Sequence, residues 1–376
     1  MLRSIISVLF LFILSSCAST NNVSSQEQII PDQKITGKKV EAPIIDDNKL
    51  NIAILVPLSK QKEQTGHLVK SAQLAMMNAR NSNLNLIPLD SGMITSDPHS
   101  LLTTLSENNV KAILGPVYAS ETEKLSSLLS DKNITILSMS NDSSIKNHNV
   151  LTLGVSPDNQ ADTLIRYAIS QGIKHFYSLL PSNKYGKLID NAVAEIVSTK
   201  NEATHSVSWY NEDNVDQVME DFITSIRNDD NQKKAIFMPQ GGSNLARLND
   251  KLQKHDLSIL LIGSQAWDHA NILNFPSFNG AMLLKQQIRN GKFYQDFNRF
   301  YHAKPTNLDL IAYNAISMLA NMDKDNITIN KQSIIDNNQD FGKYSDVRFT
   351  DKGVSLYKMS VVEVREGHFK NMDNPE

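Results

Sequence analysis

The chain has 376 residues, which is more than a single hydrophobic core usually organises, so its length predicts two domains. Its composition, 40% hydrophobic and 20% charged, is that of an ordinary soluble protein. The formal net charge is −3 and no long basic run is present, so nucleic acid is a poor candidate partner.

The N-terminal residues have the pattern of a secretory signal. Arg3 supplies a positive charge, and residues 5–14 are apolar except for Ser7, a stretch too short to span a bilayer. Residues 14–17 read Leu-Ser-Ser-Cys and resemble the bacterial lipobox, in which cleavage precedes a cysteine that becomes lipidated. The alternative is a plain signal peptide with a chance cysteine. Cys17 is the only cysteine, and its lipidation would leave the mature chain without a free thiol, so a disulfide framework and a cysteine nucleophile are both excluded.

The lipobox predicts a signal peptide at residues 1–16, followed by a lipid anchor and flexible tether at residues 17–49. Residues 18–49 are rich in Ser, Thr, Asn, Gln, Lys and Asp and have no apolar periodicity, as expected of a solvated tether. Two or three acyl chains on Cys17 would anchor the protein stably in a membrane, whereas one chain would bind only marginally.

The folded part begins with a short apolar run at residues 50–58, which predicts a strand buried on both faces of a parallel sheet. A buried helix there is disfavoured by Pro57. A polar loop at residues 59–66 and a helix at residues 67–80 follow. This succession is the opening unit of a doubly wound α/β domain, in which ligands bind beyond the carboxyl ends of the strands.

Strands and helices continue to alternate, which predicts βαβ units and a parallel sheet. One helix is expected to start with Asp97 as its N-cap and Pro98 at its first position, and another with a capping box of Ser120 and Glu123. Strands of the first series are predicted at residues 85–89, 110–114, 134–137 and 150–153.

A second series begins with a helix that Ser156 and Pro157 open. Its strands are predicted at residues 175–180, 204–209, 234–238 and 258–262. The chain then ends with two helices, at 292–302 and 307–322, a third helix headed by Ile334, and strands at 347–349 and 356–364. The predicted fold class is α/β, with two doubly wound parallel-sheet lobes and more than one crossover between them. We assign residues 50–155 and about 285–335 to the N-terminal lobe, and residues 156–284 and about 336–370 to the C-terminal lobe.

Several short motifs, taken in order, resemble the type I periplasmic binding fold over about residues 50–370. They are Ile-Ala-Ile-Leu-Val-Pro-Leu-Ser at 52–59, Ile-Leu-Gly-Pro at 113–116, Ser-Met-Ser-Asn at 138–141, Pro-Ser-Asn-Lys-Tyr-Gly at 181–186, Asp-Leu-Ile-Ala-Tyr-Asn-Ala at 309–315, and the stretch from Phe341 to Val364. Together with the lipobox and tether, they look most similar to the penicillin-binding protein activators, which are outer-membrane lipoproteins that stimulate peptidoglycan synthases. In lipoproteins resembling this one, alanine at position 18 favours the outer membrane.

The resemblance implies a ligand cleft between the two lobes. In related receptors of branched-chain amino acids, hydroxyls and backbone N–H groups hold the ligand carboxylate. By resemblance, the cleft of this chain would be lined by Gly115, Ser138, Ser140, Asn141, Tyr185 and Gln265.

Each of these positions also has a structural explanation. Gly115 can serve only to turn the chain, Ser138 and Ser140 are residues that loops and N-caps require, and Tyr185 can be half-buried packing. Gln265 is neutral where a similar amino-acid receptor would hold the ligand ammonium with an acid, and this difference weakens the solute-receptor interpretation. Trp267 in the same loop is either a surface anchor or, as we favour, buried packing.

The sequence contains none of the common motifs for catalysis, nucleotide binding or metal binding that were sought. No Gly-x-Gly-x-x-Gly, phosphate-loop or Gly-x-Ser-x-Gly pattern occurs, and no histidine pair has metal-ligand spacing. His255 and His269 are therefore read as solvated surface. The glycines at 241–242 before Ser243 are either an anion site or a loop with a serine N-cap, and the second needs no ligand. No catalytic residue, metal or cofactor is expected.

The leading hypothesis is a non-catalytic, lipid-anchored periplasmic regulator that binds and activates a peptidoglycan synthase (a penicillin-binding protein). It would sit on the periplasmic face of the bacterial outer membrane through Cys17, with a small amino-acid-like ligand as an additional partner. The alternative is a solute-binding receptor that delivers amino acids or small peptides to an ABC importer. A cell-wall hydrolase is the third and weakest hypothesis.

Overall fold

The computed structural model describes residues 49–60, 62–79, 83–145, 147–199, 203–268, 271–286, 291–338 and 347–372. The predicted signal peptide, Cys17 and the tether as far as residue 48 lie outside these residues, as do His269 and Phe341.

The first sheet is parallel throughout its described strands, in the order β2-β1-β3-β4-β5. The strands are β1 (Leu50–Val56), β2 (Leu84–Asp90), β3 (Ala112–Leu114), β4 (Thr135–Ser138) and β5 (Val150–Thr152). They are joined by the helices α1 (Lys62–Asn78), α2 (Met93–Ser96), α3 (Pro98–Glu107) and α4 (Ala119–Leu128). The predicted alternation of strand and helix is confirmed for this part of the chain.

The central strand β1 shows why a continuous apolar run forms a strand here. Ile52 and Ile54 face a core that α1 helps to form, whereas Ala53 and Leu55 face the core beneath α3 and α4. Successive side chains of a strand point to opposite faces, so a sheet covered by helices on both faces needs apolar residues at every position. All four of these side chains are fully buried.

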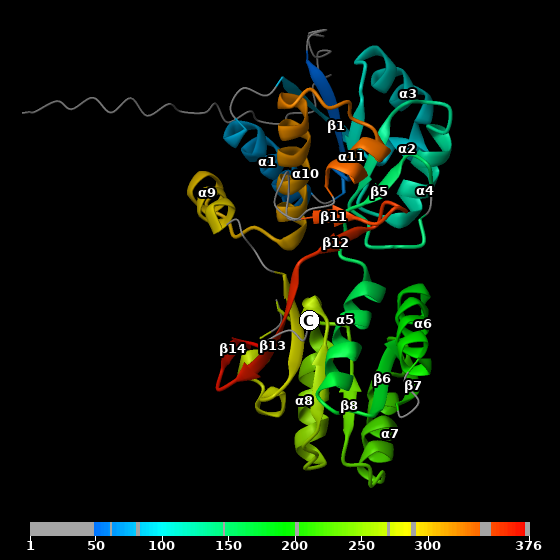
Figure 1. Ribbon diagram of the computed structural model, residues 1–376, viewed down its shortest axis with the longest axis vertical. Coiled ribbons are helices and arrows are strands. Elements are labelled where there is room, and N and C mark those ends of the chain that lie inside the picture. The colour runs from blue at the N-terminus through cyan, green and yellow to red at the C-terminus, as the bar shows by residue number, and fades with distance from the viewer. Residues whose placement is uncertain are drawn as a thin grey trace, which may run out of the picture. The chain divides into compact units, whose positions relative to one another are not determined.

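Segments from late in the chain complete the first core. The helix α10 (Asn307–Lys324) packs against α1, and Figure 1 shows these two helices, orange and blue, side by side. The helices α9 (Gly291–Tyr301) and α11 (Lys331–Asn337) and the two-stranded sheet of β11 (Val347–Phe349) and β12 (Ser355–Tyr357) also contribute buried residues to it or pack against it. Thr152 of β5 forms a parallel bridge with Val354. We call all these elements, from β1 to β5 and from α9 to β12, the first lobe.

The second sheet has the order β14-β13-β10-β9-β8-β6-β7 among the described residues. Its strands are β6 (His175–Pro181), β7 (Thr204–Tyr210), β8 (Lys234–Phe237), β9 (Leu260–Gly263), β10 (Met282–Gln286), β13 (Met359–Arg365) and β14 (His368–Asn371). The pairings from β7 to β10 are parallel, and β13 and β14 are antiparallel additions at the edge.

Helices cover both faces of this second sheet as well. One core joins the sheet to α7 and α8, and the other joins it to α5 and α6. The helical elements are α5 (Pro157–Ser170), α6 (Lys184–Ser198), α7 (Val215–Arg227), α8 (Ser243–Lys254), η1 (Gln265–Trp267), η2 (Ile272–Asn274) and η3 (Pro276–Phe278). These elements and the second sheet form the second lobe, so the predicted α/β fold with two lobes is confirmed.

The described crossovers between the lobes run side by side. Ser355 donates a hydrogen bond from Oγ to the carbonyl oxygen of Gly154 at 3.0 Å, and the Tyr357 hydroxyl donates to the carbonyl oxygen of Leu153. The sequence assigned residues from about 336 to 370 to the C-terminal lobe, but β11 and β12 lie with the first core. In this part of the chain, the crossing to the second lobe comes at Lys358. The side chains of Val347 and Phe349 are buried in the first core, and nothing in the local pattern of a strand specifies which sheet it joins.

Two predicted helix starts were wrong in detail. Tyr118, rather than Ser120, is the N-cap of α4, so the helix starts two residues earlier than predicted, and the Tyr118 side chain makes no capping hydrogen bond. Gly242, with φ of +84°, is the N-cap of α8, so Ser243 is its first helical residue. By contrast, the Asp97 side chain caps α3 and accepts a hydrogen bond from the Ser100 N–H at 3.0 Å, as predicted.

Within the described ranges, no helix combines the length and the apolar character that a membrane-spanning segment requires.

Candidate functional site

Gly115 directly follows β3, and its surroundings require glycine. Its φ is +106°, and a Cβ atom at this position would lie 2.1 Å from the Leu55 carbonyl oxygen. Its N–H donates a 2.8 Å hydrogen bond to the carbonyl oxygen of Leu137 in β4. The residue thus lets the loop after β3 pass between the backbones of its neighbouring strands, which is a structural reason for glycine.

Ser138 and Ser140 come at the end of β4, and internal hydrogen bonds engage both side chains. The Ser138 Oγ is fully buried, lies 2.7 Å from the Thr122 Oγ1, and accepts a 3.1 Å hydrogen bond from the Ser140 N–H. The Ser140 Oγ accepts one from the Asp142 N–H, also at 3.1 Å. These hydroxyls shape the loop after β4, and Ser138 would have to exchange an internal bond to hold a ligand.

The loop after β4 meets the second lobe through an ion pair. Asn141 is exposed, and the carboxylate of the next residue, Asp142, accepts a 2.6 Å hydrogen bond from the Lys184 Nζ at the start of α6. Asp142 is 13% exposed and Lys184 is 68% exposed. Burial by itself would raise the pKa of Asp142, but hydrogen bonds from Lys184 and Ser144 outweigh it and hold the pKa below its ordinary value.

The crossing segment reinforces this contact. Ser143 of the same loop and Ser156 of the crossing both donate hydrogen bonds from Oγ to the Asp158 carboxylate, at 3.1 and 2.6 Å to Oδ1. The loop after β4 is therefore linked to α5 as well as to α6.

In the second lobe, Tyr185 and Gln265 lie close to the ends of β6 and β9. Tyr185 is half-buried in the first turn of α6 and packs against the core beneath α5 and α6; burial raises its pKa to about 12. Gln265 begins η1, is 7% exposed, and donates a 2.9 Å hydrogen bond from its backbone N–H to the Gln160 Oε1.

Of the six predicted cleft residues, the structure gathers Gly115, Ser138, Ser140 and Asn141 at the ends of β3 and β4. The other two, Tyr185 and Gln265, lie at the ends of β6 and β9 in the second lobe. The groups are linked through Asp142 and Lys184, the sequence neighbours of Asn141 and Tyr185. Sequence reasoning missed this pair: Lys184 stands in the motif at 181–186 and Asp142 directly follows the motif at 138–141, but 42 positions separate the two residues and no periodicity relates them.

Trp267 is buried packing, as favoured from the sequence. Its ring is fully buried, its Nε1–H donates to the Gln240 carbonyl oxygen at 2.9 Å, and it lies 5.0 Å from the Phe278 ring, centroid to centroid. The ring also fills the space where Gly263 has no side chain, because a Cβ there would lie 1.9 Å from it.

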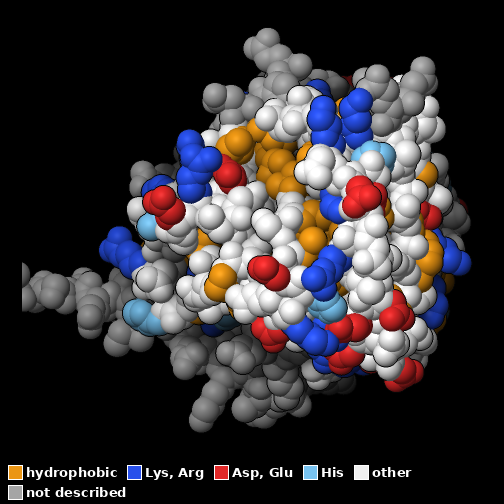
Figure 2. Space-filling view, turned by 90° about the horizontal axis from the view of Figure 1, so that it is seen from below, with side chains coloured by type: hydrophobic (Ala, Val, Ile, Leu, Met, Phe, Trp, Pro, Cys, Tyr) orange, Lys and Arg blue, Asp and Glu red, His pale blue; other side chains and the backbone are white. Residues whose placement is uncertain are grey.

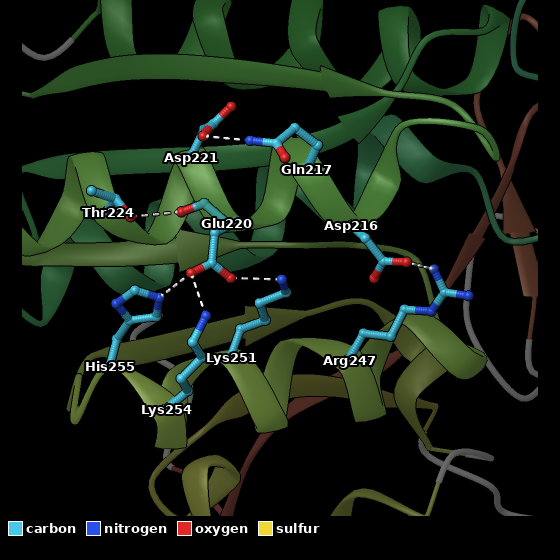
Figure 3. A network of polar contacts seen from close by, with 9 residues as sticks. All are labelled: Asp216, Gln217, Glu220, Asp221, Thr224, Arg247, Lys251, Lys254 and His255. Carbon is cyan, nitrogen blue, oxygen red and sulfur yellow. Dashed lines mark hydrogen bonds and ion pairs between the residues drawn. The ribbon is translucent and has the colours of Figure 1, made fainter.

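A polar network on α7 and α8 accounts for His255 (Figure 3). The Glu220 carboxylate accepts hydrogen bonds from Lys251 and His255 at 2.6 Å each and from Lys254 at 2.9 Å. These bonds lower the pKa of Glu220 to about 2. The network ties the two helices together, and among the described residues no cluster of three or more metal-ligand side chains occurs.

The face of the molecule seen from the lower end of Figure 1 carries acidic and basic side chains in close mixture, with hydrophobic surface between them (Figure 2).

A model of the family described as "Periplasmic binding protein" matches residues 49–352, which cover both sheets apart from β13 and β14. The chain belongs to the periplasmic binding protein family. This periplasmic binding protein is 26% identical, over 237 residues, to an uncharacterized protein of Rickettsia prowazekii (strain Madrid E). The match spans 59% of the chain and 62% of the length of that relative.

Solved structures share the fold of this periplasmic binding protein. An ABC transporter substrate-binding protein of Desulfitobacterium hafniense, in complex with Leu, is 16% identical with a TM-score of 0.63; the match covers 86% of this chain and all of that one. The C-domain of LpoA from Haemophilus influenzae, described as a regulator of PBP1A, is 15% identical with a TM-score of 0.62, and the match covers 86% and 99% of the two chains. At such identities these likenesses establish the fold alone.

Proposed function

We propose that the chain is a non-catalytic, lipid-anchored periplasmic regulator that binds and activates a peptidoglycan synthase. Support comes from the lipobox at Cys17, the polar tether, and a fold shared with an LpoA domain that is described as a regulator of PBP1A. The anchor holds the protein on the periplasmic face of the outer membrane, and the tether lets the folded part reach a partner.

The observation that carries the proposal is the internal pairing at the predicted cleft. The Ser138 hydroxyl is engaged within the first lobe, the Gln265 N–H is engaged within the second, and Asp142 and Lys184 pair with each other. A receptor for a free amino acid needs unengaged donors for the carboxylate and an acid for the ammonium. Groups that satisfy one another instead favour recognition through an outer surface.

The regulator would act by differential binding. A partner shifts an equilibrium only by favouring one state, so the chain must bind the active conformation of the synthase more tightly than the inactive one. A tenfold rise in the ratio of active to inactive synthase needs a difference of about 1.4 kcal/mol in binding free energy.

Activity measured with purified components tests the proposal. The lipidated chain is mixed with a bifunctional peptidoglycan synthase of the same organism, and glycan polymerisation and peptide crosslinking are followed. We expect at least one rate to rise and a complex to form; the absence of both would reject the proposal. The Cys17→Ser variant serves as the control, because it should activate in detergent solution but fail to incorporate labelled palmitate in cells.

A solute receptor is the second candidate, favoured by the fold shared with the Desulfitobacterium protein whose structure holds Leu. Thermal unfolding in the presence of single amino acids and short peptides separates the two candidates. A ligand at about 100 times its dissociation constant adds about 2.7 kcal/mol of stability, which is a clear rise in melting temperature. Such a rise with one amino acid would favour the receptor over the regulator.

A further inference from the structure

The second sheet ends at β7, a strand of seven residues that no other described strand continues. Proteins usually protect an exposed sheet edge with proline, with charged side chains or with a covering segment. The other edges of the two large sheets show such protection: β2 contains Pro88, the short β14 contains Lys370, and Thr152 of β5 donates a 2.9 Å hydrogen bond to the Gly353 carbonyl oxygen. β7 contains no proline and no Lys, Arg, Asp or Glu, so its sequence leaves the edge open to pairing.

Alternate residues of β7 direct their backbone groups away from the sheet. The Thr204 N–H donates to the Lys174 carbonyl oxygen, and the Tyr210 carbonyl oxygen accepts from the Ser182 N–H, both at 2.7 Å, so the even-numbered residues turn towards the β6 side. In a parallel ladder, successive residues turn their N–H and C=O groups to opposite sides. The outward groups therefore belong to three half-buried residues, which are His205, Val207 and Trp209.

These outward groups are complementary to a second copy of the same strand. A two-fold axis at Val207 sets Val207 of one copy opposite Val207 of the other, and His205 opposite Trp209. In an antiparallel ladder, each of these pairs exchanges two N–H···O=C hydrogen bonds. The side chains of Ser206 and Ser208 then meet on the other face of the sheet, and both are small. Because the strand contains no Lys, Arg, Asp or Glu, no formal charges of one sign face each other.

The helix α6 passes over the centre of β7. The Asp190 Oδ1 lies 3.6 Å from the His205 Nδ1, and a Cβ atom at Gly186 would lie 3.1 Å from the Trp209 ring. The part of α6 between Gly186 and Asp190 therefore lies over Val207, which is midway between the two contacted residues of the strand.

The flank of α6 above the strand is also complementary to itself. Lys187 is exposed and lies three residues before the 30% exposed Asp190, so both side chains are on the flank that reaches His205. A two-fold axis through Val207 runs the two copies of α6 in opposite directions. It therefore brings Lys187 of one copy towards Asp190 of the other, twice in each pair of copies.

We propose that β7 is the surface through which two copies of this chain associate, by antiparallel pairing centred on Val207 that joins their second sheets into one. An extended segment of another protein could use the backbone groups of β7, but only a second copy also accounts for the match of Lys187 with Asp190. This inference goes beyond the proposed function and does not depend on it.

Substitutions on the face opposite α6 test the pairing in solution. In the proposed register, Ser206 of one copy lies opposite Ser208 of the other. The Ser206→Lys/Ser208→Lys variant places like charges in both pairs, so its dimer dissociation constant should rise about tenfold or more. The Ser206→Lys/Ser208→Glu variant changes the same positions but places opposite charges there, and should stay within about threefold of the wild type. Sedimentation equilibrium of the full-length lipidated chain in density-matched detergent measures these constants.

A crosslinking experiment tests the register and does not rely on the charged variants. Two differently tagged full-length chains, one with Ser206→Cys and one with Ser208→Cys, are mixed and oxidised with copper phenanthroline. Directly opposite residues of a non-hydrogen-bonded antiparallel pair have Cα atoms about 4.5 Å apart, which suits a disulfide. We expect a crosslink between the two tags. Thr204→Cys mixed with Ser206→Cys is the control, and should give at least about tenfold less product because Thr204 lies opposite Tyr210.

The other outcomes would overturn the interface. A chain that sediments as a monomer at every concentration and forms no crosslink does not pair through β7, and the regulator proposal would remain in place. A dimer that survives in the Ser206→Lys/Ser208→Lys variant and crosslinks equally in the control mixture forms elsewhere on the molecule. In cells, crosslinks of the Ser206→Cys chain to a different protein, with none to the Ser208→Cys chain, would assign the edge to another occupant.

Discussion

The loop after β3 in the first lobe and the end of β9 in the second each contain a glycine that is packed against a neighbour, but the neighbours differ. At Gly115 the neighbour is the backbone carbonyl of Leu55, and at Gly263 it is the Trp267 ring. The first loop thus depends on main-chain geometry, which cannot yield, whereas the second depends on one large side chain. The same architecture therefore tolerates change differently in its two lobes.

Buried ionisable groups provide a second contrast. In the first lobe, Asp309 is 1% exposed, and burial raises its pKa although Thr306 donates hydrogen bonds to it. In the second lobe, burial lowers the pKa of His205, and the opposing effect of Asp190, 3.6 Å away, does not reverse the shift. A fall in pH should therefore lower the stability of the fold through His205 and raise it through Asp309.

The largest effect is expected for Gly115→Ala. The new Cβ would overlap the Leu55 carbonyl oxygen in a backbone region that alanine rarely adopts, and the combined cost should be about 4 kcal/mol of unfolding free energy. Urea unfolding followed by circular dichroism measures it. Gly172→Ala is the matched control, with φ of +89° and no atom within 4 Å of the added Cβ, and should cost about 1 kcal/mol. Equal costs for the two variants would contradict the close approach at Gly115.

Trp267→Phe tests the packing in the second lobe. The smaller ring leaves a cavity beside Gly263 and removes the donor to the Gln240 carbonyl, so we expect a loss of about 2 kcal/mol in the same unfolding experiment. Trp209→Phe changes the other tryptophan, which is only half-buried on β7, and should cost less. A larger loss at position 209 than at 267 would reverse the expected order.

The contrast in ionisable groups predicts opposite pH dependences. An unfolded chain protonates His205 near its ordinary pKa of 6.5, whereas the folded chain resists, so stability should fall as pH drops below about 6.5 towards the lower folded pKa. His205→Gln should flatten this part of the curve of melting temperature against pH. Asp309 has the opposite sign: its folded pKa lies above 3.8, so stability is lost as pH rises from 3.8 through the folded pKa, and Asp309→Asn should remove that loss. If both variants kept the wild-type curve of melting temperature against pH, His205 and Asp309 would be ruled out as the source of the pH dependence.

The smallest effect is expected where the two lobes meet. Lys184→Met removes the ion pair with Asp142, but Lys184 is 68% exposed and solvent screens the interaction, so the loss should stay below about 1 kcal/mol. Arg166→Met, which breaks the exposed pair with Asp162 within α5, is the control and should cost a few tenths of a kcal/mol. A loss of several kcal/mol at Lys184 would mean that the lobes depend on this contact.

The sequence predicted the local elements of the first lobe well, but in the second lobe it missed the strand β10 (Met282–Gln286). The run at residues 50–58 became β1, Asp97 and Pro98 opened α3, and the predicted strand at 347–349 matches β11. Local reasoning failed at α4, because serine and glutamate at the right spacing look like a capping box wherever the helix begins. It had no information on the sheet that β11 joins, since a strand pattern records burial and not its partner.

By itself, the sequence determined the fold class and the alternation of strand and helix, because the period of apolar residues and the residues at helix ends are local properties. Only the tertiary structure decided that Asp142 meets Lys184, that Gly115 lies against Leu55, and that Lys70 and Tyr301 join α1 to α9. These contacts link residues far apart in the chain, and their geometry follows from how the helices pack on the sheets.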